Sequence, residues 1–164
     1  MIATTPDAPF EVLVVEDNDN DVELVTIAFA KTRFDVNLTA VANGEECLKF
    51  LRKQGKHAKA PRPDLILMDI NMPRINGFEV LEAICNDPML NDLPVVIMTS
   101  SEAESDVSAS WRLRCSSYLV KPLDFSSFVH AIHVVAEYWF AVVRLPTRPV
   151  GSRCTRDLPK ATLP

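Results

Sequence analysis

The sequence has no hydrophobic run long enough to cross a membrane. A transmembrane helix needs roughly 20 consecutive apolar residues, and no stretch of the 164 residues approaches that length. The first nine residues, MIATTPDAP, also lack the basic and then apolar order of a secretory signal. We therefore expect a cytoplasmic protein without a membrane partner.

Metal-binding and disulfide patterns of cysteine are also missing. The four cysteines contain no Cys-x-x-Cys pair, and the three histidines do not cluster. This spacing indicates neither a zinc site nor a disulfide framework and favours buried or idle thiols. The cysteines are Cys47, Cys85, Cys115 and Cys154.

Positive charge is scarce outside the C-terminal end. From Arg144 onward the sequence has five basic residues and one acid, a net charge of +4. Because the whole chain has a net charge of −5, residues 1–143 carry a net charge of −9. Such an acidic body argues against nucleic acid as the main partner.

The loop Asn18–Asp21 is acidic and lacks glycine. It would repel a pyrophosphate, which argues against a dinucleotide-binding protein.

One short hydrophobic stretch organises the rest of the sequence. Leu65 to Met68 shows no polar alternation, which predicts a parallel strand covered on both faces, and Asp69 follows it directly. Ligands collect at the carboxyl edge of such sheets. Taken alone, Asp69 is equally consistent with a turn or a helix cap.

A strand followed by a helix occurs five times along the chain. This alternation predicts one α/β domain with a parallel sheet and helices on both faces. The flavodoxin-like, doubly wound strand order 2-1-3-4-5 would place the ends of the first and third strands side by side. The predicted strands are 10–15, 36–41, 65–68, 95–98 and 117–120, and the predicted helices cover about 22–31, 45–54, 78–86, 102–112 and 125–139.

The predicted strand order gathers acidic side chains. Glu16 and Asp17 follow the first strand and Asp69 follows the third. Crowded carboxylates favour a cation between them, and oxygen ligands favour Mg²⁺ with a phosphoryl partner. Lys121 and Thr99 end the fifth and fourth strands and supply a positive charge and a hydroxyl donor, although each could be an ordinary residue at a strand end. The Asp69 carboxylate could then attack phosphorus and form an acyl phosphate.

From about Glu11 to Pro146 the chain resembles a receiver domain of two-component response regulators. The matching residues are 14–17 (VVED), 67–73 (LMDINMP), Gly77, Thr99-Ser100 and Lys121-Pro122. The resemblance implies that Asp69 accepts a phosphoryl group from a histidine kinase, with Lys121 and Thr99 assisting. It also implies Mg²⁺ ligation by Asp17 and Asp69, by the backbone carbonyl of Asn71, and by Glu16 through water.

The resemblance implies further features of the switch. Thr99 and Tyr118 correspond to the switch pair of the family, and the bond between Lys121 and Pro122 would be a cis peptide. No DNA-binding or enzymatic segment follows the fifth helix, so we expect a stand-alone regulator whose output surface lies near the fourth helix, fifth strand and fifth helix. Its only catalysis would be its own phosphorylation and slow dephosphorylation.

The expected domain plan is a flexible N-terminus at 1–9, a receiver domain at 10–146 and a Pro- and Arg-rich tail at 147–164.

The stretches 60–64, 86–88, 99–104 and 138–139 resemble the stand-alone subgroup that serves bacterial phytochrome histidine kinases. Members of that subgroup often pair through the final helix and C-terminal segment. We therefore expect a homodimer through surplus apolar residues on that helix, namely Phe128, Ile132, Val135, Trp139, Phe140 and Val143.

Two other functions remain open. Haloacid-dehalogenase-type phosphohydrolases also carry an Asp nucleophile after a parallel strand, but they need a second acid two residues later. That position is Asn71, which cannot transfer protons in this role. A receiver-like binding module that works without phosphorylation is the other alternative.

Overall fold

The computed structural model describes residues 8–146 and contains the five predicted strands. The expected tail at 147–164 and residues 1–7 of the expected N-terminal segment lie outside the described residues. The strands are β1 (Phe10–Val15), β2 (Val36–Val41), β3 (Leu65–Met68), β4 (Val95–Thr99) and β5 (Ser117–Val120). The helices are α1 (Asp19–Ala30), α2 (Gly44–Leu51), α3 (Gly77–Asn86), α4 (Glu104–Arg112) and α5 (Phe125–Ala136), with a 3₁₀ turn η1 (Gly55–His57) and a π-helical segment η2 (Glu137–Val142).

The sheet is parallel, and its order β2-β1-β3-β4-β5 confirms the prediction. β1 pairs with β3 so that Val15 lies opposite Met68. β4 pairs with β5 so that Thr99 lies opposite Val120. The carboxyl ends of these strands therefore meet at one edge of the sheet.

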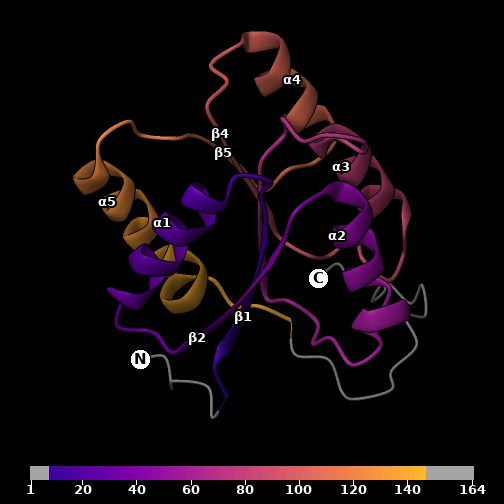
Figure 1. Ribbon diagram of the computed structural model, residues 1–164, viewed down its shortest axis with the longest axis horizontal. Helices are drawn as coiled ribbons and strands as arrows, with labels where there is room; N and C mark the ends of the chain where they lie inside the picture. The colour runs from indigo at the N-terminus through magenta and orange to yellow at the C-terminus, as the bar shows by residue number, and fades with distance from the viewer. Residues whose placement is uncertain (1–7, 147–164) are drawn as a thin grey trace, which may run out of the picture.

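Helices cover both faces of the sheet, as the alternation of strands and helices predicts. α1 and α5 lie on one face, and α2 and α3 lie on the other (Figure 1). Successive residues of a strand point to opposite faces, so Val12 and Val14 of β1 join the hydrophobic cluster under α1 and α5. Leu13 and Val15 join the cluster under α2 and α3. β3 is buried along its whole length, which explains its uninterrupted apolar sequence.

Side chains in the loops fix where most helices begin. Asn18, Asn43, Asn76 and Asp124 each accept a hydrogen bond from a backbone N–H in the first turn of the helix that follows. Such caps satisfy donors that have no partner within the helix. The helix α4 differs, because Ala103 precedes it and offers no side-chain cap.

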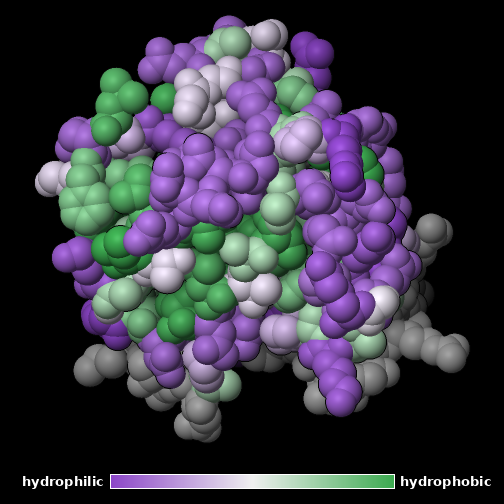
Figure 2. Space-filling model, in the orientation of Figure 1, coloured by the Kyte–Doolittle hydropathy of each residue, from purple (hydrophilic) through white to green (hydrophobic). Residues whose placement is uncertain are grey.

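The surface over the helices is uneven in polarity. Figure 2 shows hydrophobic residues gathered across the middle and left of one face, over β2, α1 and α5, whereas the side over α2 and α3 is hydrophilic. Apart from Phe125 at the start of α5, the exposed hydrophobic residues of α5 and η2 are Val134, Tyr138 and Val142, with exposed fractions of 51%, 51% and 73%. This stripe is the free apolar side of the last helix.

The residues predicted for a dimer face need correction. Phe128, Ile132, Val135 and Phe140 are buried in the cluster beneath α1 and α5, so they serve the core of the domain itself. Phe140 also stacks on Phe10, with ring centroids 4.1 Å apart. Trp139 is half-buried against the same core, and Val143 is also half-buried. The prediction placed these four buried residues wrongly because α5 must cover the sheet as well as face solvent.

No helix within residues 8–146 is long and apolar enough to span a bilayer.

Candidate functional site

Two acidic residues lie side by side at the carboxyl edge of the sheet. Glu16 follows β1 and Asp69 follows β3, and the backbone N–H of Asp69 donates to the carbonyl of Val15 at 3.0 Å. Both residues are buried, with exposed fractions of 7% and 8%. The predicted proximity of these carboxylates is confirmed, and it follows directly from the pairing of β1 with β3.

Lys121 binds this acidic pair. Its Nζ donates to Glu16 Oε2 at 2.7 Å, to Asp21 Oδ2 at 2.8 Å and to Asp69 Oδ2 at 2.9 Å. The lysine is held in place because its backbone N–H donates to the carbonyl of Thr99 at 2.7 Å. Sequence reasoning missed Asp21, which reaches the site from the first turn of α1.

Burial changes the acid–base properties of the site. Burial raises the pKa of Glu16 to about 7, although Lys121 offsets part of the effect. For Lys121, burial alone would lower the pKa, but the hydrogen bonds to Asp21, Glu16 and Asp69 raise it above its ordinary value. The ammonium therefore stays charged at neutral pH and neutralises only part of the surrounding negative charge.

The two oxygens of Asp69 have different partners. Oδ2 accepts from Lys121, whereas Oδ1 accepts from the backbone N–H of Asn71 at 3.1 Å. These donors orient the carboxylate and leave its remaining lone pairs available. A group placed at a fixed angle beside a positive charge is suited to nucleophilic attack on an anionic phosphorus centre.

The donor set fits a hard divalent cation. Three carboxylates face one ammonium, so the site keeps a net charge of −2 if all three are ionised. Exposed Asp17 lines an open hollow of about 360 Å³ next to it, together with Asn71. Within residues 8–146 no group of three or more His, Cys, Asp or Glu side chains is placed to hold a metal ion by itself. A cation here would complete its shell with a backbone carbonyl and water, as Mg²⁺ does.

Thr99 and Tyr118 are linked through Ser101. Thr99 is fully buried at the end of β4, and its Oγ1 accepts from the backbone N–H of Ser101 at 3.4 Å. The Tyr118 hydroxyl donates to the carbonyl of Ser101 at 2.9 Å. The threonine thus lies at the carboxyl edge, and the tyrosine holds the loop that follows it.

The predicted cis bond between Lys121 and Pro122 is wrong. No peptide bond within the described residues 8–146 is cis. The trans form of an X-Pro bond is favoured by only about 0.5–1 kcal/mol, so the dipeptide alone does not determine the isomer. With the trans bond, Lys121 still reaches all three carboxylates.

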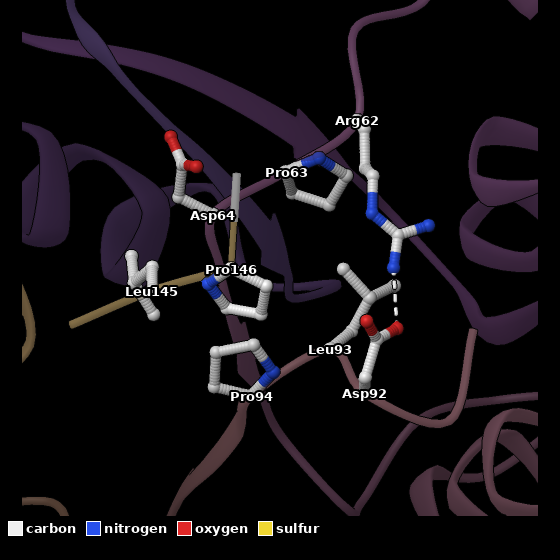
Figure 3. Close-up of a pocket in the computed structure, with 8 residues that line it drawn as sticks. All are labelled: Arg62, Pro63, Asp64, Asp92, Leu93, Pro94, Leu145 and Pro146. Atoms are coloured by element: carbon white, nitrogen blue, oxygen red, sulfur yellow. Dashed lines mark hydrogen bonds and ion pairs between the residues drawn. The ribbon is translucent and has the colours of Figure 1, made fainter. Parts of the chain in front are cut away.

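A second hollow, of about 290 Å³, lies at the opposite edge of the sheet, where β3 and β4 begin. Figure 3 shows its wall of proline, leucine and charged side chains. Arg62 is paired with Asp92 at 2.6 Å, and Asp64 accepts from the backbone N–H of Glu11 at 2.8 Å. These side chains have structural partners, and the hollow takes no part in the site around Asp69.

Comparison with known proteins gives a consistent picture. The response regulator receiver domain family matches residues 12–133. The response regulator Rcp1 of Synechocystis is 36% identical over 138 residues, which are 84% of this chain and 94% of Rcp1.

Solved structures of related proteins share the fold. The phosphorylated cyanobacterial phytochrome response regulator RcpA has a TM-score of 0.82 and 35% identity, over 85% of this chain and 100% of that one. The Mn²⁺-bound form of Rcp1 has a TM-score of 0.80 and 35% identity over the same shares. The chain therefore belongs to the response regulator receiver domain family.

Proposed function

We propose that this protein is a stand-alone response regulator of a two-component phosphorelay, phosphorylated on Asp69 by a histidine kinase in the cytoplasm. The observation that carries the proposal is the arrangement at Asp69, where Lys121 Nζ lies 2.9 Å from Oδ2 and the N–H of Asn71 lies 3.1 Å from Oδ1. A carboxylate held in this way can act as an acceptor of a phosphoryl group.

In the proposed reaction an Asp69 oxygen forms a bond to phosphorus as the bond from phosphorus to the kinase histidine nitrogen breaks. The nitrogen keeps the electron pair and takes a proton from water. Lys121 balances negative charge on the transferring group. Buried Thr99 supplies its hydroxyl to the new phosphoryl group. Thr99 and Tyr118 would then change their hydrogen-bond partners. This change would alter the conformation of the surface formed by α4, β5 and α5.

The cofactor in this proposal is Mg²⁺. By the family pattern Asp17 and Asp69, the carbonyl of Asn71 and, through water, Glu16 would hold it. Its chemistry would be to neutralise charge on the phosphoryl oxygens. The excess of three carboxylates over one lysine in this cluster and the Mn²⁺-bound form of the relative Rcp1 support a divalent cation.

The test is intact mass after incubation with Mg²⁺ and acetyl phosphate, compared with Asp69→Asn and with Asp92→Asn, an acid outside the site. We expect one added phosphoryl group in the wild type and in Asp92→Asn, and none in Asp69→Asn or without metal. If no adduct forms although Mg²⁺ binds, the protein is a binding module that works without phosphorylation. Continuous turnover of a phosphomonoester would indicate a phosphohydrolase.

A phytochrome-type histidine kinase is the proposed phosphodonor, because the similar protein RcpA is described as a phytochrome response regulator. The measurement is the rate of phosphotransfer from a purified bacteriophytochrome kinase, compared with the rate from a kinase of another sensor type. Transfer that is faster from the phytochrome kinase by tenfold or more supports the pairing, since about 1.4 kcal/mol of transition-state preference gives that ratio. Equal rates would contradict it.

We also propose a homodimer that forms through the exposed side of α5 and η2. Val134, Tyr138 and Val142 follow one another at intervals of four residues, so they lie on one side of the helix. Contiguous exposed apolar residues of this kind mark protein contacts. Half-buried Trp139 and Val143 flank the stripe and keep the contact role that the sequence predicts for them.

A further inference from the structure

The segment η2, which continues α5, is wound more widely than an α-helix. The backbone N–H of Val143 donates to the carbonyl of Tyr138, five residues earlier, at 2.9 Å. An α-helix, with about 3.6 residues per turn, would bring Trp139 to the sheet after buried Val135. In the wider turn Phe140 is buried instead, with 6% exposure, whereas Trp139 is half-buried. Such π-helical turns are rare and frequently occur at functional sites.

Phe140 anchors η2 from the inside. Its ring stacks on Phe10 of β1, with centroids 4.1 Å apart, and meets the Phe34 ring edge to face at 5.5 Å. Phe29 of α1 lies against the same ring, with centroids 6.5 Å apart. Aromatic pairs in these geometries stabilise a structure beyond the area that they bury. The buried side of η2 is therefore held by rings from β1, from α1 and from the segment between α1 and β2.

Arg33 holds η2 from the solvent side. Its Nε donates to Glu137 Oε1 at 2.8 Å and its Nη2 donates to Oε2 at 3.0 Å, so the pair has two parallel bonds. The same guanidinium lies over the Phe34 ring, 4.5 Å from the centroid. Arg33 thus joins the first residue of η2 to a ring that packs against Phe140. A single exposed ion pair contributes little to stability, but two parallel bonds fix the geometry of the pair.

The exposed side of this turn belongs to the proposed dimer contact. Tyr138 directly follows Glu137, and Val142 ends the same segment. Tyr138 and Val142 are 51% and 73% exposed. A contact surface that is already fixed before association loses less conformational entropy when it binds. A residue that fixes η2 can therefore strengthen association without touching the second copy.

We infer that Arg33 is a positioning residue for self-association, which through its two bonds to Glu137 fixes η2 so that Tyr138 and Val142 face a second copy of this chain. The inference rests on the proposed homodimer. The contact between Arg33 and Glu137 is made within one copy, so its effect on η2 should be present in the monomer. A direct contact of Arg33 with the second copy would have no such effect.

The test uses Arg33→Gln in the full chain labelled with 3-fluorotyrosine. The sequence has two tyrosines, so fluorine NMR gives one signal from Tyr138 on η2 and one reference signal from Tyr118 on β5. The spectra are recorded with Val142→Arg present, so that association does not contribute. We expect Arg33→Gln to move or broaden the Tyr138 signal alone.

The second measurement is the dissociation constant of the dimer, obtained by sedimentation velocity without Val142→Arg. We expect Arg33→Gln to raise this constant about 3- to 10-fold, because a modest ion pair is lost from both copies. The two measurements together connect the position of η2 with association.

Three further variants separate geometry from charge. Arg33→Lys keeps the charge but cannot make two parallel bonds, so it should reproduce most of the effect of Arg33→Gln. Lys31→Gln removes a charge from the exposed C-cap of α1, two residues away, and should leave both measurements at their wild-type values. Glu137→Ala should move the Tyr138 signal as Arg33→Gln does. The double variant should move it no further, because both changes remove one contact.

The outcomes distinguish the inference from the proposed homodimer. A wild type that is monomeric at every concentration refutes the homodimer and the role of Arg33 in association with it. If the wild type forms a dimer but the Tyr138 signal does not move in Arg33→Gln, Arg33 is not a positioning residue, even where the dimer is weaker. A moved signal with an unchanged dissociation constant, or equal effects of Lys31→Gln and Arg33→Gln, would also refute the inference.

Discussion

The ammonium of Lys121 lies 2.8 Å from the carboxylate of Asp21, almost the same distance as from Asp69, which is 2.9 Å away. Asp21 belongs to the first turn of α1, and its side chain is 28% exposed, whereas that of Asp69 is 9% exposed. The lysine that should balance charge on a phosphoryl group is thus shared with an acid that is not the acceptor. Asp21 would therefore compete with a phosphoryl group on Asp69 for Lys121.

Asp21→Asn should therefore speed phosphorylation of Asp69. The change releases Lys121 from one ion pair and removes a negative charge that repels an anionic donor. We expect the initial rate with acetyl phosphate to rise roughly two- to fivefold, less than 1 kcal/mol of barrier. Intact mass against time measures the rate. The matched control is Asp19→Asn, an exposed acid in the same turn, and an Asp21→Asn rate equal to or below the control rate would contradict the prediction.

Much of the site could be predicted from local sequence because the pairing of the β-strands places its residues. Unbroken apolar runs fix β1 and β3, and the pairing of these strands then forces Glu16 and Asp69 together. Lys121 follows from the same logic, since β5 ends beside β4. Residues that act from the end of a strand are thus accessible to sequence reasoning.

Asp21 could not be found in this way. Its contact with Lys121 joins residues 100 positions apart and depends on how α1 lies against the sheet. The burial of Phe128 and Ile132 was missed for a related reason. A broad apolar stripe does not reveal which part of it meets the sheet and which part meets solvent, because that division depends on the rotation of α5 about its axis.

The raised pKa of Glu16 predicts a stability that depends on pH. In the fold this pKa is about 7, against an ordinary value of 4.5, because the carboxyl is buried. The folded protein then binds more protons than the unfolded chain between these values, so its free energy of unfolding falls as pH rises through this window. At 1.36 kcal/mol per pKa unit the loss is on the order of 3 kcal/mol.

Urea unfolding at pH 5 and pH 8, in the presence of a chelator, measures this effect. Glu16→Gln has no proton to lose, so its stability should change less between the two pH values than that of the wild type. The control is Glu11→Gln, which replaces a half-buried acid in β1, the strand that precedes Glu16. If Glu16→Gln and wild type lose the same stability, the burial cost assigned to Glu16 is incorrect.

Gly77 packs against the backbone of Asp69 and Ile70, and its replacement should lower both the stability of the fold and the rate of phosphorylation. A Cβ atom at Gly77 would lie 2.6 Å from Ile70 Cα and 2.8 Å from the carbonyl oxygen of Asp69. These backbone atoms cannot move without displacing Asp69. We expect Gly77→Ala to cost about 1–3 kcal/mol of stability, as overpacking does, and to slow the reaction with acetyl phosphate.

Denaturant unfolding and the mass assay measure the two effects of Gly77→Ala separately. The control is Glu82→Ala, an exposed position on the same helix, which should change neither. A Gly77→Ala protein with wild-type stability and rate would mean that α3 can shift away from the strand end without moving Asp69.

The exposed stripe on α5 and η2 gives a prediction for self-association. Val142 is 73% exposed and lies beyond the buried part of the helix, so Val142→Arg adds charge to the proposed contact without entering the core. We expect it to weaken the dimer at least tenfold, which corresponds to about 1.4 kcal/mol. Sedimentation velocity over a range of protein concentrations measures the change. A buried contact surface loses affinity when one side presents an unpaired charge.

Met89→Arg is the matched control, because Met89 is also an exposed hydrophobic residue, with 47% exposure, but lies in the segment between α3 and β4. It should leave the association constant unchanged. A wild-type protein that sediments as a monomer at every concentration would exclude the homodimer. A dimer weakened equally by both substitutions, or by Met89→Arg alone, would show that the contact does not lie on α5. The reason is that a charge at position 142 weakens the dimer selectively only if the second copy covers that side chain.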